Sequence, residues 1–104
     1  MIPSSVRIFV CNEPQDMRRS FDGLSRAAEE HLGEDPQGGA LFCFVNKRCN
    51  RLKVLWFDRN AFCILYKRLH GAKFVLPDKR VIDARVLSEV LRGVENDRRN
   101  RVHS

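Results

Sequence analysis

The fold is decided by residues 41–69, LFCFV-NKRCNR-LKVLWF-DRN-AFCILYKRL, where three runs of β-branched and aromatic residues are separated by two short polar linkers. This pattern is typical of consecutive antiparallel strands joined by hairpin turns. It predicts a three-strand meander. Five of the seven Phe, the only Trp and the only Tyr lie between Leu41 and Phe74. We therefore expect the hydrophobic core to be centred on this sheet.

The segments that flank the meander supply a further strand and a helix on its N-terminal side. Val6–Val10 alternates only partly, with Val6, Ile8 and Val10 to one side and Arg7 and Phe9 to the other. It predicts a strand covered on one face and half covered on the other. Apolar residues then recur at helical spacing over Met17–Leu32, after Asp16 as a candidate N-cap and before Gly33 as a candidate C-terminal cap. The pattern predicts one amphipathic helix here.

The segment that follows the meander supplies a further strand and a second helix. Lys73–Leu76 predicts a short fourth strand of the same sheet, ended by Pro77. A helix is predicted from Asp83, its N-cap candidate, to about Val94. The sequence thus predicts a single α+β domain in the order β-α-β-β-β-β-α, with a central antiparallel meander and two amphipathic helices packed on one face.

The chain of 104 residues fits one domain. We place that domain in residues 1–94 and predict that residues 95–104 form a frayed, polar and basic tail. The four cysteines at positions 11, 43, 49 and 63 include no Cys-x-x-Cys pair, which favours reduced thiols in a cytosolic protein. No leader peptide and no apolar run of roughly 20 residues is seen, so a cytoplasmic location is expected.

Positive charge is concentrated in the sheet segment. Residues 41–80 contain ten Lys or Arg and two acidic residues, whereas residues 1–40 contain four basic and seven acidic residues. The whole chain has a formal net charge of +6. Such clustering favours an anionic partner, and the alternative is a surface that only keeps a small basic protein soluble.

The order and spacing of several short blocks resemble a known family. These blocks are Asp16–Leu24 (DMRRSFDGL), Leu41-Phe42-x-Phe44, Leu52-Lys53-x-Leu55-Trp56-x-Asp58, Phe62-Cys63-x-x-Tyr66-Lys67-Arg68-Leu69 and Phe74-x-x-Pro77. From Met1 to about Val94 the chain resembles the TnpB (second open reading frame, Orf2-like) accessory proteins of IS66-type insertion sequences. The resemblance implies a bacterial protein needed for transposition, encoded beside a separate transposase that holds the catalytic carboxylates. It implies no catalytic residue and no cofactor.

The chain departs from that family pattern at four positions. Ser20, Cys49 and Ala61 stand where the pattern has glycine, and Leu76 stands where it has tryptophan. If Cys49 and Ala61 occupy turn positions with positive φ, they impose backbone strain that glycine would avoid. An inactive, drifted copy of the family is therefore one alternative.

The residues do not favour catalysis. Metal-assisted phosphodiester cleavage needs carboxylates that converge on one point, and Asp16 and Asp22, six residues apart, are separated by about 600° of helical rotation. Asp58 alone would not complete such a site. A zinc site would have to use residues that lack the short knuckle spacing: Cys43, Cys49, Cys63 and His70. With no Gly-rich phosphate loop either, we expect a non-enzymatic protein without metal or cofactor.

Nucleic-acid binding is the favoured function. The first hairpin linker and the start of the next strand carry Lys47, Arg48, Arg51 and Lys53, and basic side chains on such a loop can follow a phosphate backbone. We expect Lys67, Arg68 and Lys73 to assist them. The predicted partners are DNA, at the ends of the insertion sequence, and the transposase of the same element.

Two alternatives concern how these residues are used. Alternation along the third run can place Arg68 on one face with Phe62, Ile64 and Tyr66, which would suit stacking on unpaired bases. The preferred interpretation is that Phe62, Ile64 and Tyr66 belong to the core. The protein could also be an adaptor that grips the transposase without binding DNA, with its second helix and the basic residues of its first helix as docking surfaces: Arg18, Arg19 and Arg26.

Overall fold

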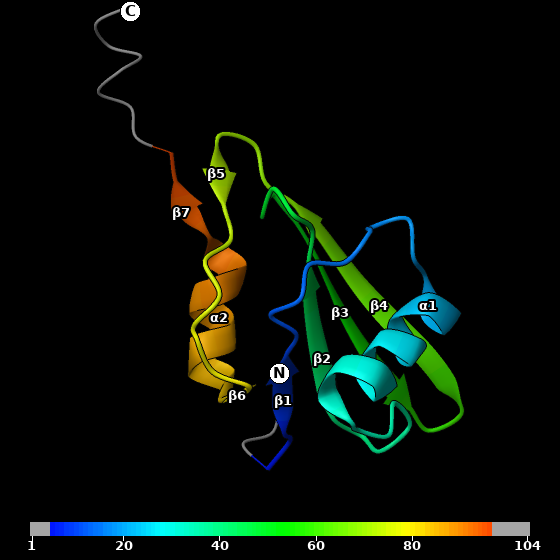
Figure 1. Cartoon of the computed structure of the whole chain (residues 1–104). Coiled ribbons are helices and arrows are strands. Elements are labelled where there is room, and N and C mark those ends of the chain that lie inside the picture. The colour runs from blue at the N-terminus through cyan, green and yellow to red at the C-terminus, as the bar shows by residue number, and fades with distance from the viewer. Residues whose placement is uncertain (1–4, 97–104) are drawn as a thin grey trace, which may run out of the picture.

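The computed structural model describes residues 5–96, and a five-stranded mixed sheet runs through its centre in the order β4-β3-β2-β1-β6 (Figure 1). β1 pairs in parallel with β2, and every other neighbouring pair in the sheet is antiparallel. The strands are β1 (Ile8–Val10), β2 (Leu41–Val45), β3 (Arg51–Asp58), β4 (Ala61–Arg68) and β6 (Val81–Ile82). The predicted α+β class and the meander over residues 41–69 are confirmed.

The two predicted helices are present, although the first is shorter than predicted. α1 (Phe21–Ala27) continues as the π-helical turn η1 (Ala28–Leu32), and α2 spans Ala84–Arg92. Gly33 ends the first helix at φ 64°, as its position predicted. Asp83 caps α2, since its side chain accepts a hydrogen bond from the Val86 backbone N–H at 2.9 Å. Within residues 5–96, neither helix has the length and apolar character to cross a bilayer.

The first helix begins at Phe21 and not near Met17 because Asp16 makes a local turn. Its carboxylate accepts from the Arg18 backbone N–H at 2.8 Å, and its carbonyl accepts from the Arg19 N–H at 3.0 Å. These contacts satisfy Asp16 within its own turn, which is a common alternative to helix capping for this residue type. The segment before α1 therefore stays non-helical and approaches the sheet.

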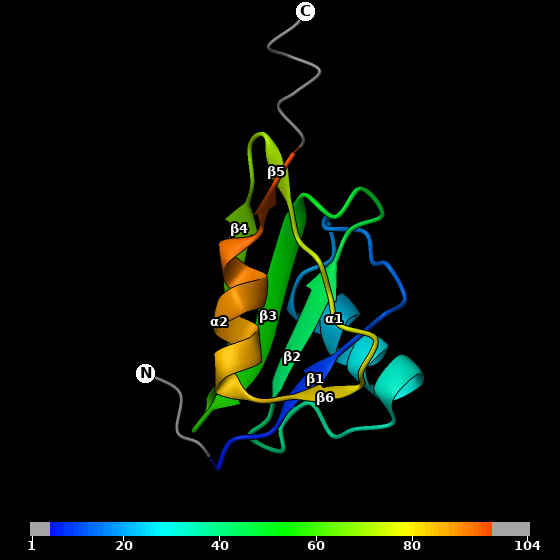
Figure 2. The same cartoon turned by 90° about the vertical axis from the view of Figure 1, so that its left-hand side faces the viewer.

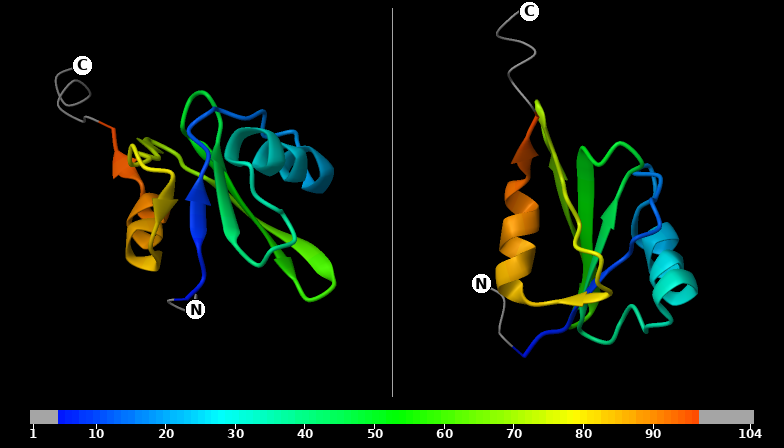
Figure 3. Two further views of the ribbon diagram at one scale, coloured as in Figure 1. Left: turned by 60° about the horizontal axis from the view of Figure 1, so that its bottom comes forward. Right: turned by 60° about the vertical axis from the view of Figure 1, so that its left-hand side comes forward.

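The two helices pack on opposite faces of the sheet, so the prediction that both pack on one face is wrong (Figures 2 and 3). α1 and η1 cover one face, where Phe42, Phe44 and Leu55 are fully buried. α2 covers the other face, where Cys43 and Leu52 are fully buried. Consecutive strand residues point to opposite faces, and both sets in β2 are apolar, so each face needs its own helical layer.

The predicted fourth meander strand, Lys73–Leu76, is also corrected. β5 (Ala72–Lys73) pairs with β7 (Val94–Glu95) in a separate two-stranded sheet. Phe74 follows β5 and is 1% exposed in the core on the α2 side. The predicted tail therefore starts inside a paired strand at Glu95, and residues 97–104 of that tail lie outside the described residues.

The cysteines are free thiols in two environments. Cys11 and Cys43 are buried, whereas Cys49 and Cys63 are partly exposed. Burial raises the pKa of the Cys43 thiol to about 12. Cys43 is therefore protonated at neutral pH and packs as a small apolar side chain.

Candidate nucleic-acid interface

The turn between β2 and β3 is held in shape by one asparagine. The Asn46 side-chain oxygen accepts from the backbone N–H groups of Asn50 and Arg51, both at 3.0 Å, and its Nδ2 donates to the Asn50 Oδ1 at 2.7 Å. Lys47 and Arg48 lie on this turn and are exposed. A side chain that accepts hydrogen bonds from backbone N–H groups stabilises the conformation of a turn. Lys47 and Arg48 therefore project from a turn of fixed backbone conformation.

The turn contains one residue in a strained backbone conformation, Cys49. Cys49 has φ 58°, a left-handed conformation that costs roughly 1–2 kcal/mol for a residue with a Cβ. In the β3–β4 turn the residue with positive φ is Arg59, at 57°, and not Ala61. The condition for strain, a positive φ, is therefore met at Cys49 and is not met at Ala61.

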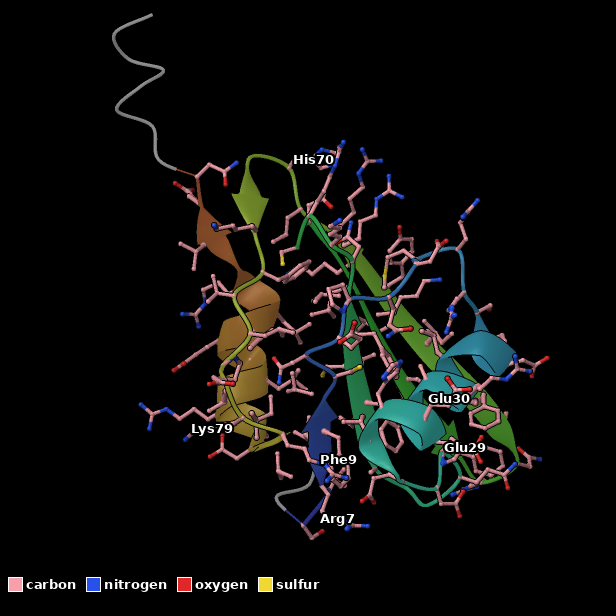
Figure 4. The ribbon with its side chains drawn as sticks, in the orientation of Figure 1. Arg7, Phe9, Glu29, Glu30, His70 and Lys79 are labelled. Atoms are coloured by element: carbon pink, nitrogen blue, oxygen red, sulfur yellow. The ribbon has the colours of Figure 1, made fainter. Side chains whose placement is uncertain are left out.

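The segment that follows β4 is tied to the same turn. The Leu69 backbone N–H donates to the Asn50 carbonyl at 2.8 Å, and the Phe74 N–H donates to the Cys49 carbonyl at 2.6 Å. These bonds bring Arg68 and Lys73, the neighbours of Leu69 and Phe74, to the end of the sheet that carries the turn. His70 lies at this end, beside several nitrogen-tipped side chains (Figure 4).

An open cleft of about 520 Å³ lies between this turn and the segment before α1. The Gln15 backbone N–H donates to the Val45 carbonyl at 2.8 Å, which fixes that segment beside the end of β2. One wall of the cleft carries Pro14, Gln15, Asp16, Met17 and Arg18, and the other carries Asn46, Lys47, Arg48 and Arg51. The cleft is therefore lined by four cationic side chains and one carboxylate.

The carboxylate in the cleft is neutralised by its neighbour. The Arg18 Nη2 donates to the Asp16 Oδ2 at 2.6 Å, and its Nε lies 3.1 and 3.0 Å from the two carboxylate oxygens. The Arg18 side-chain hydrogen bond, and then its backbone N–H, lower the pKa of Asp16 to about 2. Asp16 is thus paired with Arg18. Within residues 5–96, no acidic side chain forms an ion pair with Lys47, Arg48 or Arg51.

An NMR titration of the Asp16 carboxyl group is expected to give a midpoint of about 2 in place of 3.8. Because the folded pKa lies below the unfolded one, the contribution of this carboxylate to stability is complete above about pH 4 and is lost as the pH falls through about 2. Arg18→Ala should move the midpoint back toward 3.8, and Arg19→Ala should change it little. A midpoint near 3.8 in the unmodified protein would contradict the assigned pair.

Two arginines of the candidate surface face each other across neighbouring strands. Arg51 of β3 is the direct cross-strand partner of Arg68 in β4. Like charges in this arrangement destabilise a sheet, and within the described part of the chain neither arginine has an acidic partner. A bound anion between them would offset that repulsion. We refer to Lys47, Arg48, Arg51 and Arg68 as the basic hairpin surface.

Three of the seven predicted binding residues lie outside the basic hairpin surface. Lys53 is only 9% exposed, and its Nζ donates to the Arg19 carbonyl at 2.7 Å. Lys67 points to the α2 side, where its Nζ donates to the Leu91 carbonyl at 2.6 Å. Because both ammonium groups donate to backbone carbonyls, we leave these two lysines out of the proposed binding surface. Lys73 is exposed on β5, next to the surface.

The aromatic and aliphatic residues on the α1 face of β4 divide between the core and the surface. Phe62 and Ile64 are partly buried against the core on the α1 side, which confirms the core interpretation for these two. Tyr66 is 50% exposed. The Lys53 Nζ lies 5.0 Å from the centroid of the Tyr66 ring. The alternation of side chains along a strand predicts that Phe62, Ile64 and Tyr66 share one face of the sheet. It does not indicate how much of that face α1 covers.

A second hollow of about 550 Å³ lies on the opposite face, between α2 and strands β3 and β4. Its walls are largely apolar and include Val54, Trp56, Leu65, Leu87 and Leu91. A polyanion requires cations and hydrogen-bond donors, so the basic hairpin surface and its cleft are the better candidate for a nucleic acid. Within residues 5–96, no three His, Cys, Asp or Glu side chains gather closely enough to share a metal ion.

The comparisons with known proteins assign the chain to a family. The family description "IS66 Orf2 like protein" (TnpB_IS66) matches residues 6–101. The chain therefore belongs to the TnpB_IS66 family of IS66 Orf2-like, transposition-associated proteins. The resemblance predicted from the short sequence blocks is confirmed.

Two relatives come from Sinorhizobium fredii (strain NBRC 101917 / NGR234). The protein titled "Uncharacterized protein y4hO" is 34% identical over 101 residues, which cover 91% of this chain and 88% of that protein. The protein titled "Uncharacterized protein y4jC" is 36% identical over 72 residues, which cover 69% of this chain and 62% of that protein. No solved structure matches this chain.

Proposed function

We propose that this protein is a non-enzymatic accessory protein of insertion-sequence transposition that binds DNA through the basic hairpin surface. It acts in the bacterial cytoplasm on the ends of the element, together with the transposase that the same element encodes. The transposase supplies the strand-transfer chemistry, and this protein supplies a docking surface for DNA.

The observation that supports this proposal is the display, on a fixed turn, of cations that form no ion pair among the described residues. Lys47 and Arg48 are exposed, Arg51 is partly exposed, and no acid within residues 5–96 neutralises any of them. Cations that are not consumed by internal ion pairs bind phosphates and release the counterions condensed on DNA. Membership of a transposition-associated family makes DNA the relevant polyanion.

The proposal is tested by gel-shift titrations with duplex, single-stranded and end-repeat DNA, each run with and without the transposase. We expect the protein alone to shift DNA at low salt, and the transposase to add to that binding. A protein that shifts no DNA at micromolar concentration and 50 mM salt, yet captures the transposase, would be an adaptor and would contradict the proposal.

A further inference from the structure

Tyr66 stands out because it is a large aromatic side chain left half exposed beside two arginines. The ring lies on the α1 side of β4, beyond the residues that pack against the core. Arg68 is two residues farther along the same strand and on the same face, which corresponds to a separation of about 7 Å. Arg51 lies directly opposite Arg68. One exposed ring is therefore adjacent to two guanidinium groups that form no ion pair with an acidic side chain of residues 5–96.

The Tyr66 ring is held in place before any ligand arrives. Lys53 is the direct cross-strand partner of Tyr66, and its Nζ lies 5.0 Å from the ring centroid. That ammonium group is itself fixed by its 2.7 Å hydrogen bond to the Arg19 carbonyl. A buried lysine that supports one side of the ring reduces the side-chain entropy lost when the ring binds a ligand. Half of the side chain remains open to solvent.

The chemistry of this arrangement distinguishes single-stranded from duplex DNA. Phosphates are available in both forms, and the arginines would serve either. The flat face of a base is covered by its neighbours in a duplex and is accessible in an unpaired strand, where it stacks on aromatic side chains. An exposed tyrosine beside phosphate-binding arginines is therefore of use mainly to an unpaired nucleotide.

We propose that the basic hairpin surface binds single-stranded DNA, with a phosphate held between Arg51 and Arg68 and the neighbouring base stacked on Tyr66. This inference depends on the proposed function and specifies its ligand. Unpaired strands at the ends of the element during transposition are the class of substrate that fits it.

The experiment compares a 20-nucleotide oligothymidylate with an abasic oligodeoxyribonucleotide of the same length and charge, by fluorescence anisotropy. The unmodified protein is expected to prefer the strand that carries bases. Tyr66→Ala should weaken binding to oligothymidylate by about 5- to 150-fold, the range found for loss of one base–aromatic stack. The same variant should bind the abasic strand and a duplex within twofold of the unmodified protein, while Tyr66→Phe keeps the preference.

Two controls separate stacking from loss of structure. Leu65→Ala removes a neighbouring side chain that is 41% exposed but points to the opposite face, and it should leave the preference intact. Tyr66→Leu keeps a shorter, non-aromatic apolar side chain beside Lys53 and should lose the preference with little change in thermal melting.

The outcomes distinguish this inference from the proposed function. If the unmodified protein binds duplex and both single strands equally, or if Tyr66→Ala keeps the full preference, the stacking site is wrong and DNA binding by the basic hairpin surface stands. If the protein binds none of these ligands, both fail.

Discussion

Replacing Lys47, Arg48 and Arg51 together by Glu is expected to weaken DNA binding by about 100-fold or more. Each substitution removes a charge-assisted contact with phosphate worth roughly 1 kcal/mol or more. Each introduced glutamate also repels the phosphate groups. The magnitude of the slope of log affinity against log salt should fall by about 2 to 3 units, at roughly 0.7–0.9 for each of the three lost phosphate contacts. The thermal melt should stay within a few degrees, because Asn46 holds the turn through backbone and Asn50 contacts.

A matched variant separates the surface from total charge. Arg59, Lys79 and Arg85 are exposed and lie outside the basic hairpin surface: Arg59 lies in the β3–β4 turn, at the opposite end of those strands from Arg51 and Arg68. Replacing these three by Glu changes the net charge by the same amount, and affinity should fall by less than about tenfold. Equal losses in the two triple variants would mean that net charge alone attracts DNA.

Phe42→Ala is expected to lower the free energy of unfolding by about 3–5 kcal/mol. The side chain is fully buried on the α1 side of the sheet, and its ring stacks against Phe9 with centroids 5.7 Å apart. Removing the Phe42 ring leaves a cavity between the middle strand of the sheet and the α1 layer. The neighbouring side chains relax only partly into such a cavity. This loss is a large part of the 5–15 kcal/mol that stabilises a typical domain.

The comparison for this variant is Phe21→Ala, which removes the same side chain where it is 43% exposed at the start of α1. Its cost should be under about 1.5 kcal/mol, since less apolar surface returns to water. Urea unfolding with an unchanged m-value measures both. Similar costs at the two positions would contradict the assignment of Phe42 to the centre of the core.

The meander could be predicted from sequence because its information is local. Each strand carries its own apolar pattern, and the two-residue turn Arg59–Asn60 fixes an uninterrupted β3–β4 register from Arg51 with Arg68 to Asp58 with Ala61. Which face a helix covers is not local information. The sequence does indicate that both faces are covered, because Ile8–Val10 and Phe42–Val45 are runs of consecutive apolar residues, all of which are buried in the structure. The apolar stripe of a helix, however, does not specify which face of the sheet that helix covers.

The cations at the turn could be predicted because turn tips project from a sheet. Lys53 and Lys67 could not be excluded in the same way. Whether a lysine is displayed or buried depends on which carbonyl its ammonium group reaches, and the two partners lie 34 and 24 residues away in sequence. The exposure of Tyr66 has a similar cause, since it depends on the length of α1 and not on β4 itself.

The most direct test of the account is the salt dependence of DNA binding by the unmodified protein. We expect log affinity to fall linearly with log salt, with a slope of about −3 or steeper, because the basic hairpin surface contributes four cations at roughly 0.7–0.9 per phosphate. Affinity that is unmeasurable at low salt, or that does not change between 50 and 200 mM salt, would contradict the claim that these cations bind DNA.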